Sequence, residues 1–330
     1  MSIPKVSVCV PAYNNPEEVE RLLKSLFEQT FTDWELIVSD DSKDDRVGCV
    51  VRSMCGSIAQ ERFHYQKNAV PLGHVFNWNE VLKLSHGEYA KIMFSDDFFT
   101  DRDSLLAYVE LLDSDPKADL GFSGSRQVLL DTKDGGANLS RQNGDFSGRD
   151  MKTTAEGFLY FDREAGDEYI NSLRADYRHL FTGNQIGAPS AVILRRRKDG
   201  TVPLFDEETT YTSDMLLYFD AFTGGNGVFA YTPRPLASIG VHSKQYTEGF
   251  GDIDPRVYND MLIMYKKYDL QDSKECRAYF AREYIVRYHK SIREGTELGI
   301  SPALIIKERF LLLIRSASCF VQSRINGRSS

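Results

Sequence analysis

Short apolar runs and amphipathic segments alternate along the first part of this chain. Residues 6–10 form a nearly all-apolar, β-rich run that ends at Pro11, and residues 34–39 form a second such run that ends at Asp40. Between these runs, apolar residues recur at helical spacing over residues 19–27. The pattern predicts a strand, a helix and a second strand, which together make one βαβ unit.

The same alternation continues further along the chain. Strands are predicted at residues 62–66, 89–93 and 120–124, and helices at residues 75–85 and 104–112. Strands that alternate with helices form a mostly parallel sheet, whose carboxyl ends meet at one edge. We therefore expect an α/β fold that binds its ligands at that edge.

The second half of the chain is less regular. It contains a predicted strand at residues 191–194, a helix at 213–222 and two strands, 228–231 and 236–239, around a Pro-rich turn. Beyond residue 251 the pattern is helical to the end.

A long segment of low periodicity interrupts the middle of the chain. Residues 131–148 are rich in Asp, Gly, Asn and Ser and have almost no apolar spacing. Loops of this length are usually lids, binding loops or disordered inserts. Our hypothesis is that this segment folds over bound substrates.

The last predicted helix begins at Ser301 and Pro302, a good cap followed by a good first-turn residue. Its apolar residues are mixed with basic ones, namely Lys307, Arg309, Arg315 and Arg324. Basic amphipathic helices either lie on anionic membranes or dock on their own domain or a partner subunit. Peripheral contact with a membrane and a homodimer are therefore both open.

Paired acids follow two of the predicted strands. Asp40 and Asp41 end the strand at residues 34–39, and Asp96 and Asp97 follow the strand at residues 89–93. Neighbouring carboxylates repel each other, and a divalent cation or a set of hydrogen-bond donors is the usual relief. The two pairs therefore predict a polar site at the shared edge of the sheet.

Composition narrows the class of protein. The 330 residues are 42% hydrophobic and 12% aromatic, enough for a sizeable core, and the formal charge is −8. Nucleic acid as the main partner requires a basic surface, so the charge argues against it. A phosphorylated small ligand remains compatible, because a metal ion supplies positive charge.

Cysteine usage and the N-terminus favour the cytoplasm. The five cysteines are scattered without a C-x-x-C spacing, so they suggest neither a disulfide framework nor a zinc site. The chain reaches a strand at once, with no signal-peptide core, and no run approaches the length of a membrane span.

Four segments, taken together and in order, resemble the family 2 glycosyltransferases of GT-A fold. They are residues 6–14, residues 29–42, Asn68 with Gly73 and Asn77, and residues 94–97. The match resumes at residues 211–217, at Gly224 and Gly225, and at residues 240–243.

This resemblance implies a Rossmann-like α/β/α sandwich with a mostly parallel sheet and a C-terminal helical extension. Residues 1–115 would form the donor-binding half, residues 116–250 the acceptor and catalytic-base half, and residues 251–330 the extension. The implied enzyme is an inverting glycosyltransferase that uses a nucleotide-diphosphate sugar, with a UDP-sugar as the expected donor, and Mn²⁺ or Mg²⁺. The implied acceptor is a hydroxyl of a glycan or lipid-linked glycan, as in bacterial surface polysaccharide assembly.

The resemblance also implies roles for the acidic pair after residue 93. Asp97 would bind the cation that stabilises the charge of the leaving diphosphate, and Asp96 would contact the donor's ribose or sugar. His242 occupies a position where related enzymes use a His near the metal or diphosphate. The Arg that commonly precedes this His is replaced by Ile239 and Gly240, which puts the diphosphate contact in doubt.

The nucleoside is expected at the ends of the first two strands. Tyr13 would offer an aromatic face, Ala12 its backbone, and Asp41 a carboxylate for the base or ribose. Asp40 is an equal candidate for that contact, because adjacent strand residues point in opposite directions. The resemblance adds further donor-site residues, namely Pro11, Asn68, Gly73, Asn77 and Ser95.

Asp214, at the start of a predicted helix, occupies the family's base position and would take the proton of the acceptor hydroxyl. A helix N-terminus tends to keep a carboxylate ionised, which lowers its proton affinity. Glu207 and Glu208 are reserve candidates.

Single sugar addition is favoured, because the membrane spans and the Gln-x-x-Arg-Trp motif of processive synthases are absent from the sequence. A sugar-nucleotide nucleotidyltransferase is one alternative, although residues 11–16 lack the Gly-rich, basic loop that binds a triphosphate. The other alternative is a catalytically silent sugar-nucleotide binding module.

Overall fold

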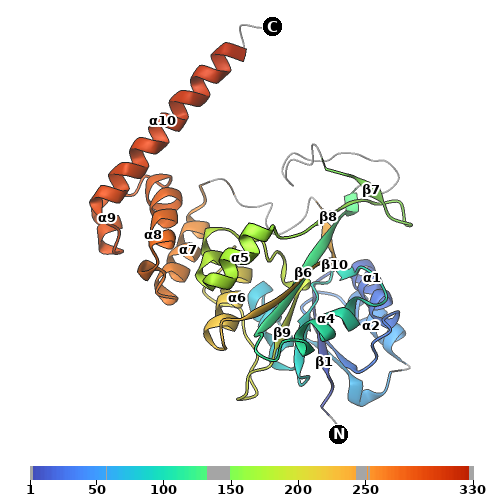
Figure 1. Ribbon diagram of the computed structural model, residues 1–330. Coiled ribbons are helices and arrows are strands. Elements are labelled where there is room, and N and C mark those ends of the chain that lie inside the picture. Colours follow the sequence, from blue (N-terminus) through green and yellow to red (C-terminus); the bar gives the residue numbers. More distant parts are fainter. Residues whose placement is uncertain (1–2, 57, 132–148, 243–250, 252, 327–330) are drawn as a thin grey trace. The chain divides into compact units, whose positions relative to one another are not determined.

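The computed structural model describes residues 3–56, 58–131, 149–242, 251 and 253–326, with side chains as far as residue 314 except at Gln60. The chain divides into two compact units (Figure 1). Unit 1 comprises Met1–Tyr177 and Asn184–Phe250, and unit 2 comprises Arg178–Gly183 and Gly251–Ser330. The hypothesis of a lid at residues 131–148 concerns residues that, apart from Asp131, lie outside the described part.

Unit 1 is built on one mixed sheet with the strand order β3-β2-β1-β4-β9-β6-β10-β5, and β7 and β8 extend it beside β6. The β3-β2-β1-β4 portion is parallel, as is the β6-β10 pair, whereas β9 and β5 are antiparallel to their neighbours. The strands are β1 Val6–Ala12, β2 Trp34–Asp40, β3 Phe63–Lys67, β4 Tyr89–Ile92, β5 Phe98–Phe99, β6 Leu120–Leu129, β7 Lys152–Thr153, β8 Leu159–Arg163, β9 Val192–Arg195 and β10 Phe229–Val241. The predicted α/β fold with a mostly parallel sheet is confirmed.

Helices follow the strands in the alternating order that the sequence predicts. In Figure 1, α1 and α2 lie side by side next to the sheet. The α-helices of unit 1 are α1 Pro16–Phe27, α2 Arg46–Cys55, α3 His74–Lys83, α4 Ser104–Asp113, α5 Asp167–Ala175 and α6 Ser213–Thr223. Short 3₁₀ turns are η1 Gln60–Arg62 and η5 Pro189–Ala191, and η4 Tyr177–Thr182 spans the boundary between the units.

The core of unit 1 lies between the sheet and α1. Val8 and Val10 of β1 are fully buried, and so are Leu22, Leu23 and Leu26 on one face of α1. These helix residues follow the spacing of an amphipathic helix, which packs its apolar face on the sheet. The burial holds β1 in the sheet, and its carboxyl end carries the loop that contains Tyr13.

The two strands expected at residues 228–231 and 236–239 are a single long strand, β10. The pairing of β10 with β6 shifts register between Thr232 and Pro235, and again between Pro235 and Ala237. Proline lacks a backbone N–H and is tolerated in sheets at bulges, so the Pro-rich stretch bends the strand without ending it.

Unit 2 is helical, as predicted for the end of the chain. Its elements are α7 Pro255–Lys267, η7 Leu270–Asp272, α8 Lys274–Phe280, a π-helical turn η8 Ala281–Val286, α9 Ile292–Glu297 and α10 Pro302–Asn326. An aromatic cluster forms its interior, with Tyr265 and Phe280 stacked at a centroid distance of 4.3 Å and Phe181 beside them. Among the described helices, none is both long and apolar enough to cross a membrane.

Candidate functional site

Predicted site residues meet at the carboxyl edge of the parallel strands. The register of β1 and β2 pairs Ala12 with Asp40, so the loops that follow both strands leave the sheet side by side. Asn15, in the loop after β1, donates from Nδ2 to Oγ of Ser95 at 2.6 Å, which ties that loop to the turn after β4. Residues that are distant in the sequence thus share one edge, as the topology predicted.

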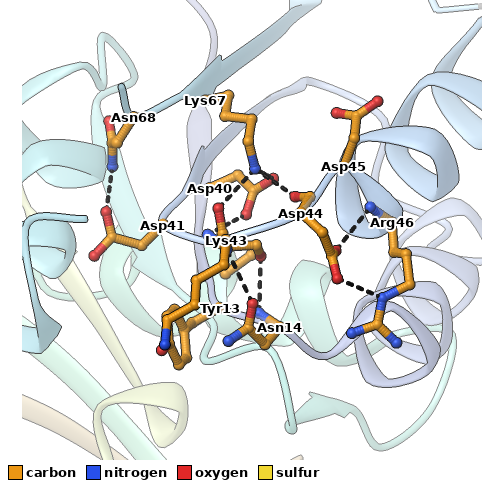
Figure 2. Close-up of polar contacts among 12 residues, drawn as sticks. Tyr13, Asn14, Asp40, Asp41, Lys43, Asp44, Asp45, Arg46, Lys67 and Asn68 are labelled. Carbon is orange, nitrogen blue, oxygen red and sulfur yellow. Dashed lines mark hydrogen bonds and ion pairs between the residues drawn. The ribbon is translucent and has the colours of Figure 1, made fainter. Parts of the chain in front are cut away.

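Asp40 and Asp41 point to opposite sides of the chain (Figure 2). Asp40 is fully buried and accepts hydrogen bonds from the Tyr65 hydroxyl at 2.8 Å and the Ser42 amide at 2.9 Å. Its Oδ2 also lies 3.5 Å from Nζ of Lys67. The Asp40 carboxylate therefore holds the loop after β2 in place. Hydrogen bonds within the loop region are enough to account for this acidic residue.

Asp41 is bound by the loop that leads into α3. Its carboxylate accepts from the backbone amides of Leu72 at 2.9 Å and Gly73 at 2.8 Å. It also accepts from Nδ2 of Asn68 at 2.9 Å (Figure 2). Gly73 has φ +90°, a left-handed conformation that favours glycine, and it precedes the first residue of α3. Asp41 thus holds the Gly73 turn in place.

The amides of Asn68 and Asn77 complete this network. Nδ2 of Asn68 donates to Oδ1 of Asn77 at 3.1 Å, and Nδ2 of buried Asn77 donates to the carbonyl of Ser39 at 3.2 Å. A weaker contact of 3.5 Å joins the same amide to the carbonyl of Ala12. Four of the predicted donor-site residues, Asp41, Asn68, Gly73 and Asn77, therefore belong to one hydrogen-bond network at the ends of β1 and β2.

Tyr13 is exposed, unlike the two residues that precede it. It is 45% exposed, whereas Pro11 and Ala12 are buried within β1. A large aromatic ring open to solvent at a ligand-binding edge offers a stacking surface to a planar base.

The second acidic pair lies where β5 pairs with β10. The register joins Ala237 to Phe99 and Ser238 to Phe98, so the end of β10 runs alongside the turn at Asp96 and Asp97. The amide of Gly240 donates to Oδ1 of Asp97 at 2.9 Å. Nε2 of His242 lies 3.3 Å from Oδ2 of Asp96, and both side chains are partly exposed.

Asp97 is nearly buried, at 3% exposed. Burial, and then the neighbouring carboxylate of Asp96, raise the pKa of Asp97 well above its usual range. Hydrogen bonds from Ser190 and Gly240 oppose this rise in the pKa of Asp97. A carboxylate in such a place needs positive charge to stay ionised.

Lys91 lies on β4, interacts electrostatically with Asp97 and is fully buried. Its Nζ donates to the carbonyl of Ser190 and sits 4.6 Å from the centre of the Tyr108 ring. Burial lowers the pKa of Lys91 to about 7. The sequence gives no signal that this lysine lies near the acidic pair, because its flanking residues are those of an ordinary buried strand.

The polar groups of Asp96, Asp97 and His242 suit a hard divalent cation, since carboxylate oxygens and an imidazole are ligands of Mn²⁺ or Mg²⁺. No group of three or more His, Cys, Asp or Glu side chains in the described residues is arranged to enclose a metal ion. A cation at this turn would therefore need further ligands from a bound diphosphate.

Asp214 lies in the first turn of α6. Its Oδ1 accepts from the Met215 amide at 2.8 Å and its Oδ2 from Nδ2 of Asn184 at 2.7 Å. The sequence led us to expect a lowered proton affinity, but burial raises the pKa of Asp214 to about 6. Loss of solvation outweighs the helix terminus here, which gives a carboxylate suited to accept a proton near neutral pH.

Glu207 and Glu208, the reserve candidates for the general base, lie in a more exposed setting than Asp214. Glu207 and Glu208 are exposed, and Oε1 of Glu207 accepts from Nδ2 of Asn79 at 3.1 Å and lies 3.4 Å from Nζ of Lys83. This ion pair ties Glu207 to α3.

The segment of residues 184–190 contacts both Asp97 and Asp214. Asn184 binds Asp214, and six residues later Ser190 binds Asp97 and accepts from the Phe94 amide at 2.9 Å. The segment turns at Gly187, whose φ is +93° and whose amide donates to Oδ1 of Asn184 at 3.0 Å. The sequence by itself assigned no role to this segment. The turn-forming Asn and Gly were the available signal.

Comparison with protein families and known proteins gives consistent matches. The model of the family described as Glycosyl transferase family 2 matches residues 7–154. A GalNAc(5)-diNAcBac-PP-undecaprenol beta-1,3-glucosyltransferase of Campylobacter jejuni is 31% identical over 154 residues, which cover 47% of this chain and 46% of the relative. The Escherichia coli UDP-Glc:alpha-D-GlcNAc-diphosphoundecaprenol beta-1,3-glucosyltransferase WfgD is 29% identical over 94 residues, covering 28% of this chain and 36% of the relative.

Among solved structures, S. aureus TarS 1-349 in complex with UDP-GlcNAc superposes with a TM-score of 0.53 at 16% identity, covering 92% of this chain and 89% of that chain. At this identity the likeness supports the fold alone. The chain matches about half or less of the length of the curated relatives.

The close approach of Gly240 to the acidic turn predicts the effect of a single methyl group. In Gly240→Ala, the new Cβ would collide with the carbonyl oxygen of Asp96 and lie 2.8 Å from Cδ1 of Leu130. We expect a loss of about 1–3 kcal/mol in the free energy of unfolding, measured by urea denaturation. Gly166→Ala is the matched control, because its Cβ would have only an ordinary contact of 3.8 Å with Gln185. Equal stability of the two variants would contradict the close approach.

Proposed function

This chain belongs to glycosyl transferase family 2, whose model matches residues 7–154, and from that assignment we propose that it is an inverting, single-addition glycosyltransferase. Its donor is a nucleotide-diphosphate sugar, and its acceptor is a hydroxyl of a glycan or lipid-linked glycan. The observation that carries the proposal is a pair of differently placed carboxylates. Asp97 is buried beside Asp96 and His242, and Asp214, with a pKa raised to about 6, is linked to Asp97 through residues 184–190.

The donor is proposed to be UDP-linked. In support, the E. coli relative is named for UDP-Glc, and Tyr13 offers an exposed ring at the ends of β1 and β2. Asp41 is the proposed contact for the base or ribose, with the hydrogen bonds from Leu72 and Gly73 fixing its orientation. Asp40 serves to position the loop, because its oxygens are bound by Tyr65, Ser42 and Lys67.

The acceptor is proposed to be a glycan on a lipid carrier, because both named relatives act on undecaprenol-linked glycans.

The described cysteines are all free thiols, which favours a reducing compartment and thus the cytoplasm as the place of reaction.

Asp97 is the proposed ligand of a divalent cation, with His242 beside it and Asp96 orienting the donor. When bound, the cation would neutralise negative charge on the diphosphate as it leaves. The amide of Gly240 and the hydroxyl of Ser190 hold the Asp97 carboxylate, and buried Lys91 contributes positive charge nearby. These contacts fix the orientation of the Asp97 carboxylate.

Asp214 is the proposed general base. It takes the proton of the acceptor hydroxyl while the hydroxyl oxygen forms a bond to the anomeric carbon of the donor sugar. The bond between that carbon and the diphosphate oxygen breaks on the opposite face, and the nucleoside diphosphate leaves with the bonding electrons. One carboxylate is enough for this displacement, which inverts the anomeric centre.

The metal site is tested by thermal unfolding with donor. Among UDP-Glc, GDP-mannose and dTDP-glucose, we expect UDP-Glc to raise Tm most in the presence of Mn²⁺, because a ligand that binds the native state stabilises it. Asp97→Ala should abolish the Mn²⁺-dependent part of the shift. Asp150→Ala, which removes a side chain that is 89% exposed, should leave it unchanged. A metal-dependent shift that survives in Asp97→Ala would refute the metal assignment.

The base is tested with Asp214→Asn, which keeps the shape of the side chain and removes its basicity. We expect the transfer rate to fall by about 10²–10⁴-fold while donor stabilisation stays nearly intact. For the wild-type enzyme the rate should fall as the pH drops below about 6, because protonation disables the base. Glu207→Gln is the control and should retain activity. Wild-type rates in Asp214→Asn would exclude Asp214 as the base.

A positioning role for Asn184 gives a separate prediction. Its hydrogen bond lowers the pKa of Asp214, so Asn184→Ala should raise the pKa of that carboxyl and move the acidic limb of the pH–rate profile to higher pH. Gln185→Ala, which removes a neighbouring amide that binds Gly166 instead, should leave the limb in place. An unshifted profile in Asn184→Ala would show that the bond does not orient the base.

The products distinguish the alternative functions. A transferase releases nucleoside diphosphate as the acceptor gains a sugar, whereas a nucleotidyltransferase exchanges pyrophosphate. A silent binding module would show donor stabilisation without turnover.

A further inference from the structure

Helix α10 presents two different faces over its described side chains. Ile305 is fully buried and packs against the α9 position of Gly295, and Glu308 is also buried. On the other side, Ile306, Phe310 and Leu313 are 56%, 62% and 68% exposed. Ile306, Phe310 and Leu313 are separated by four and three residues, so they form one stripe along the helix. Leu312 and Ile314, at other positions around the helix, are also exposed, at 43% and 46%.

Large apolar side chains on a surface are normal when they occur singly. Many of the other exposed ones in the described residues, such as Ile3, Phe27 and Ile253, belong to separate segments. The stripe on α10 differs because three consecutive turns of one helix each contribute such a side chain. A contiguous exposed apolar stripe of this kind marks a contact surface.

The charges around the stripe are positive. Lys307 is exposed next to Ile306, and Arg309 donates from Nη2 to the carbonyl oxygen of Lys290 at 2.6 Å, a neutral acceptor. After Glu308, the sequence of α10 contains Arg309, Arg315 and Arg324 and no Asp or Glu. The whole chain carries a formal charge of −8, so this helix is a basic segment in an acidic protein.

Charge complementarity selects the partner. An apolar stripe with flanking cations matches an anionic lipid surface, where the side chains enter the boundary of headgroups and acyl chains and the cations meet lipid phosphates. Two copies of α10 paired through the stripe would bring together basic segments that offer no acidic partners beyond Glu308, and like charges would oppose that pairing. The helix is also unsuited to crossing the bilayer.

We propose that α10 is an interfacial helix that binds anionic membrane surfaces through Ile306, Phe310 and Leu313. Because the proposed acceptor is carried on a lipid, this contact would bring the enzyme to its substrate. The inference does not depend on catalysis, since binding to vesicles is measured without donor or acceptor.

The test is co-flotation of the full chain with phosphatidylglycerol–phosphatidylcholine vesicles and with pure phosphatidylcholine vesicles. We expect binding to the anionic vesicles that weakens as salt is added. The double variant Phe310→Ser, Leu313→Ser should reduce the partition coefficient at least about tenfold, because binding scales with buried apolar area. Lys307→Glu should weaken binding to anionic vesicles only.

The matched control is Ile3→Ser, Ile253→Ser, which removes two exposed apolar side chains elsewhere and should bind like the wild type. Since the substituted residues on α10 are exposed, the thermal unfolding of the double variant and its stabilisation by donor should be unchanged. If donor stabilisation fails in the wild type as well, the proposed function fails and the membrane result stands separately.

Two results would overturn the proposal. One is binding that is equal on neutral and anionic vesicles or unaffected by the double variant. The other is a dimer, measured by light scattering without lipid, that dissociates in the double variant, which would identify a second copy as the partner of this face.

Discussion

The pairing of β5 with the end of β10 is the constraint on which the rest of the site depends. It sets the amide of Gly240 at 2.9 Å from the Asp97 carboxylate and brings His242 to Asp96. A nearly buried carboxylate next to another acid is unfavourable unless donors or a cation compensate it. The backbone amide of Gly240, the Ser190 hydroxyl and the positive charge of Lys91 supply part of that compensation. A divalent cation is the proposed source of the remainder.

At the edge formed by β1 and β2, hydrogen-bond donors likewise compensate buried carboxylates. Asp40 and Asp41 both lie at the carboxyl ends of parallel strands, and both are occupied in fixing loops. Asp41 orders the Gly73 turn before α3, and Asp40 orders the loop toward Lys67. The exposed ring of Tyr13, the proposed stacking surface for the base, is thereby carried on a well-bonded loop. If a ligand binds there as proposed, less conformational entropy is lost on binding.

Residues 184–190 contact both the proposed general base and the proposed metal ligand. Asn184 binds Asp214 at one end of the segment, and Ser190 binds Asp97 at the other. The raised pKa of Asp214 follows from burial, and the Asn184 bond limits the rise in that pKa. The same segment thus contributes to both the position and the proton affinity of the proposed base.

The sequence by itself determined the alternation of strands and helices, the edge at which both acidic pairs lie, and the family. These are local signals, because apolar spacing and turn residues act within one element. Only the tertiary structure decided that Gly240, 143 positions away, binds Asp97, that buried Lys91 interacts electrostatically with it, and that β10 continues through its prolines. It also reversed the expected direction of the Asp214 pKa, because desolvation depends on residues brought together from distant parts of the chain, whereas the helix terminus is visible in the sequence.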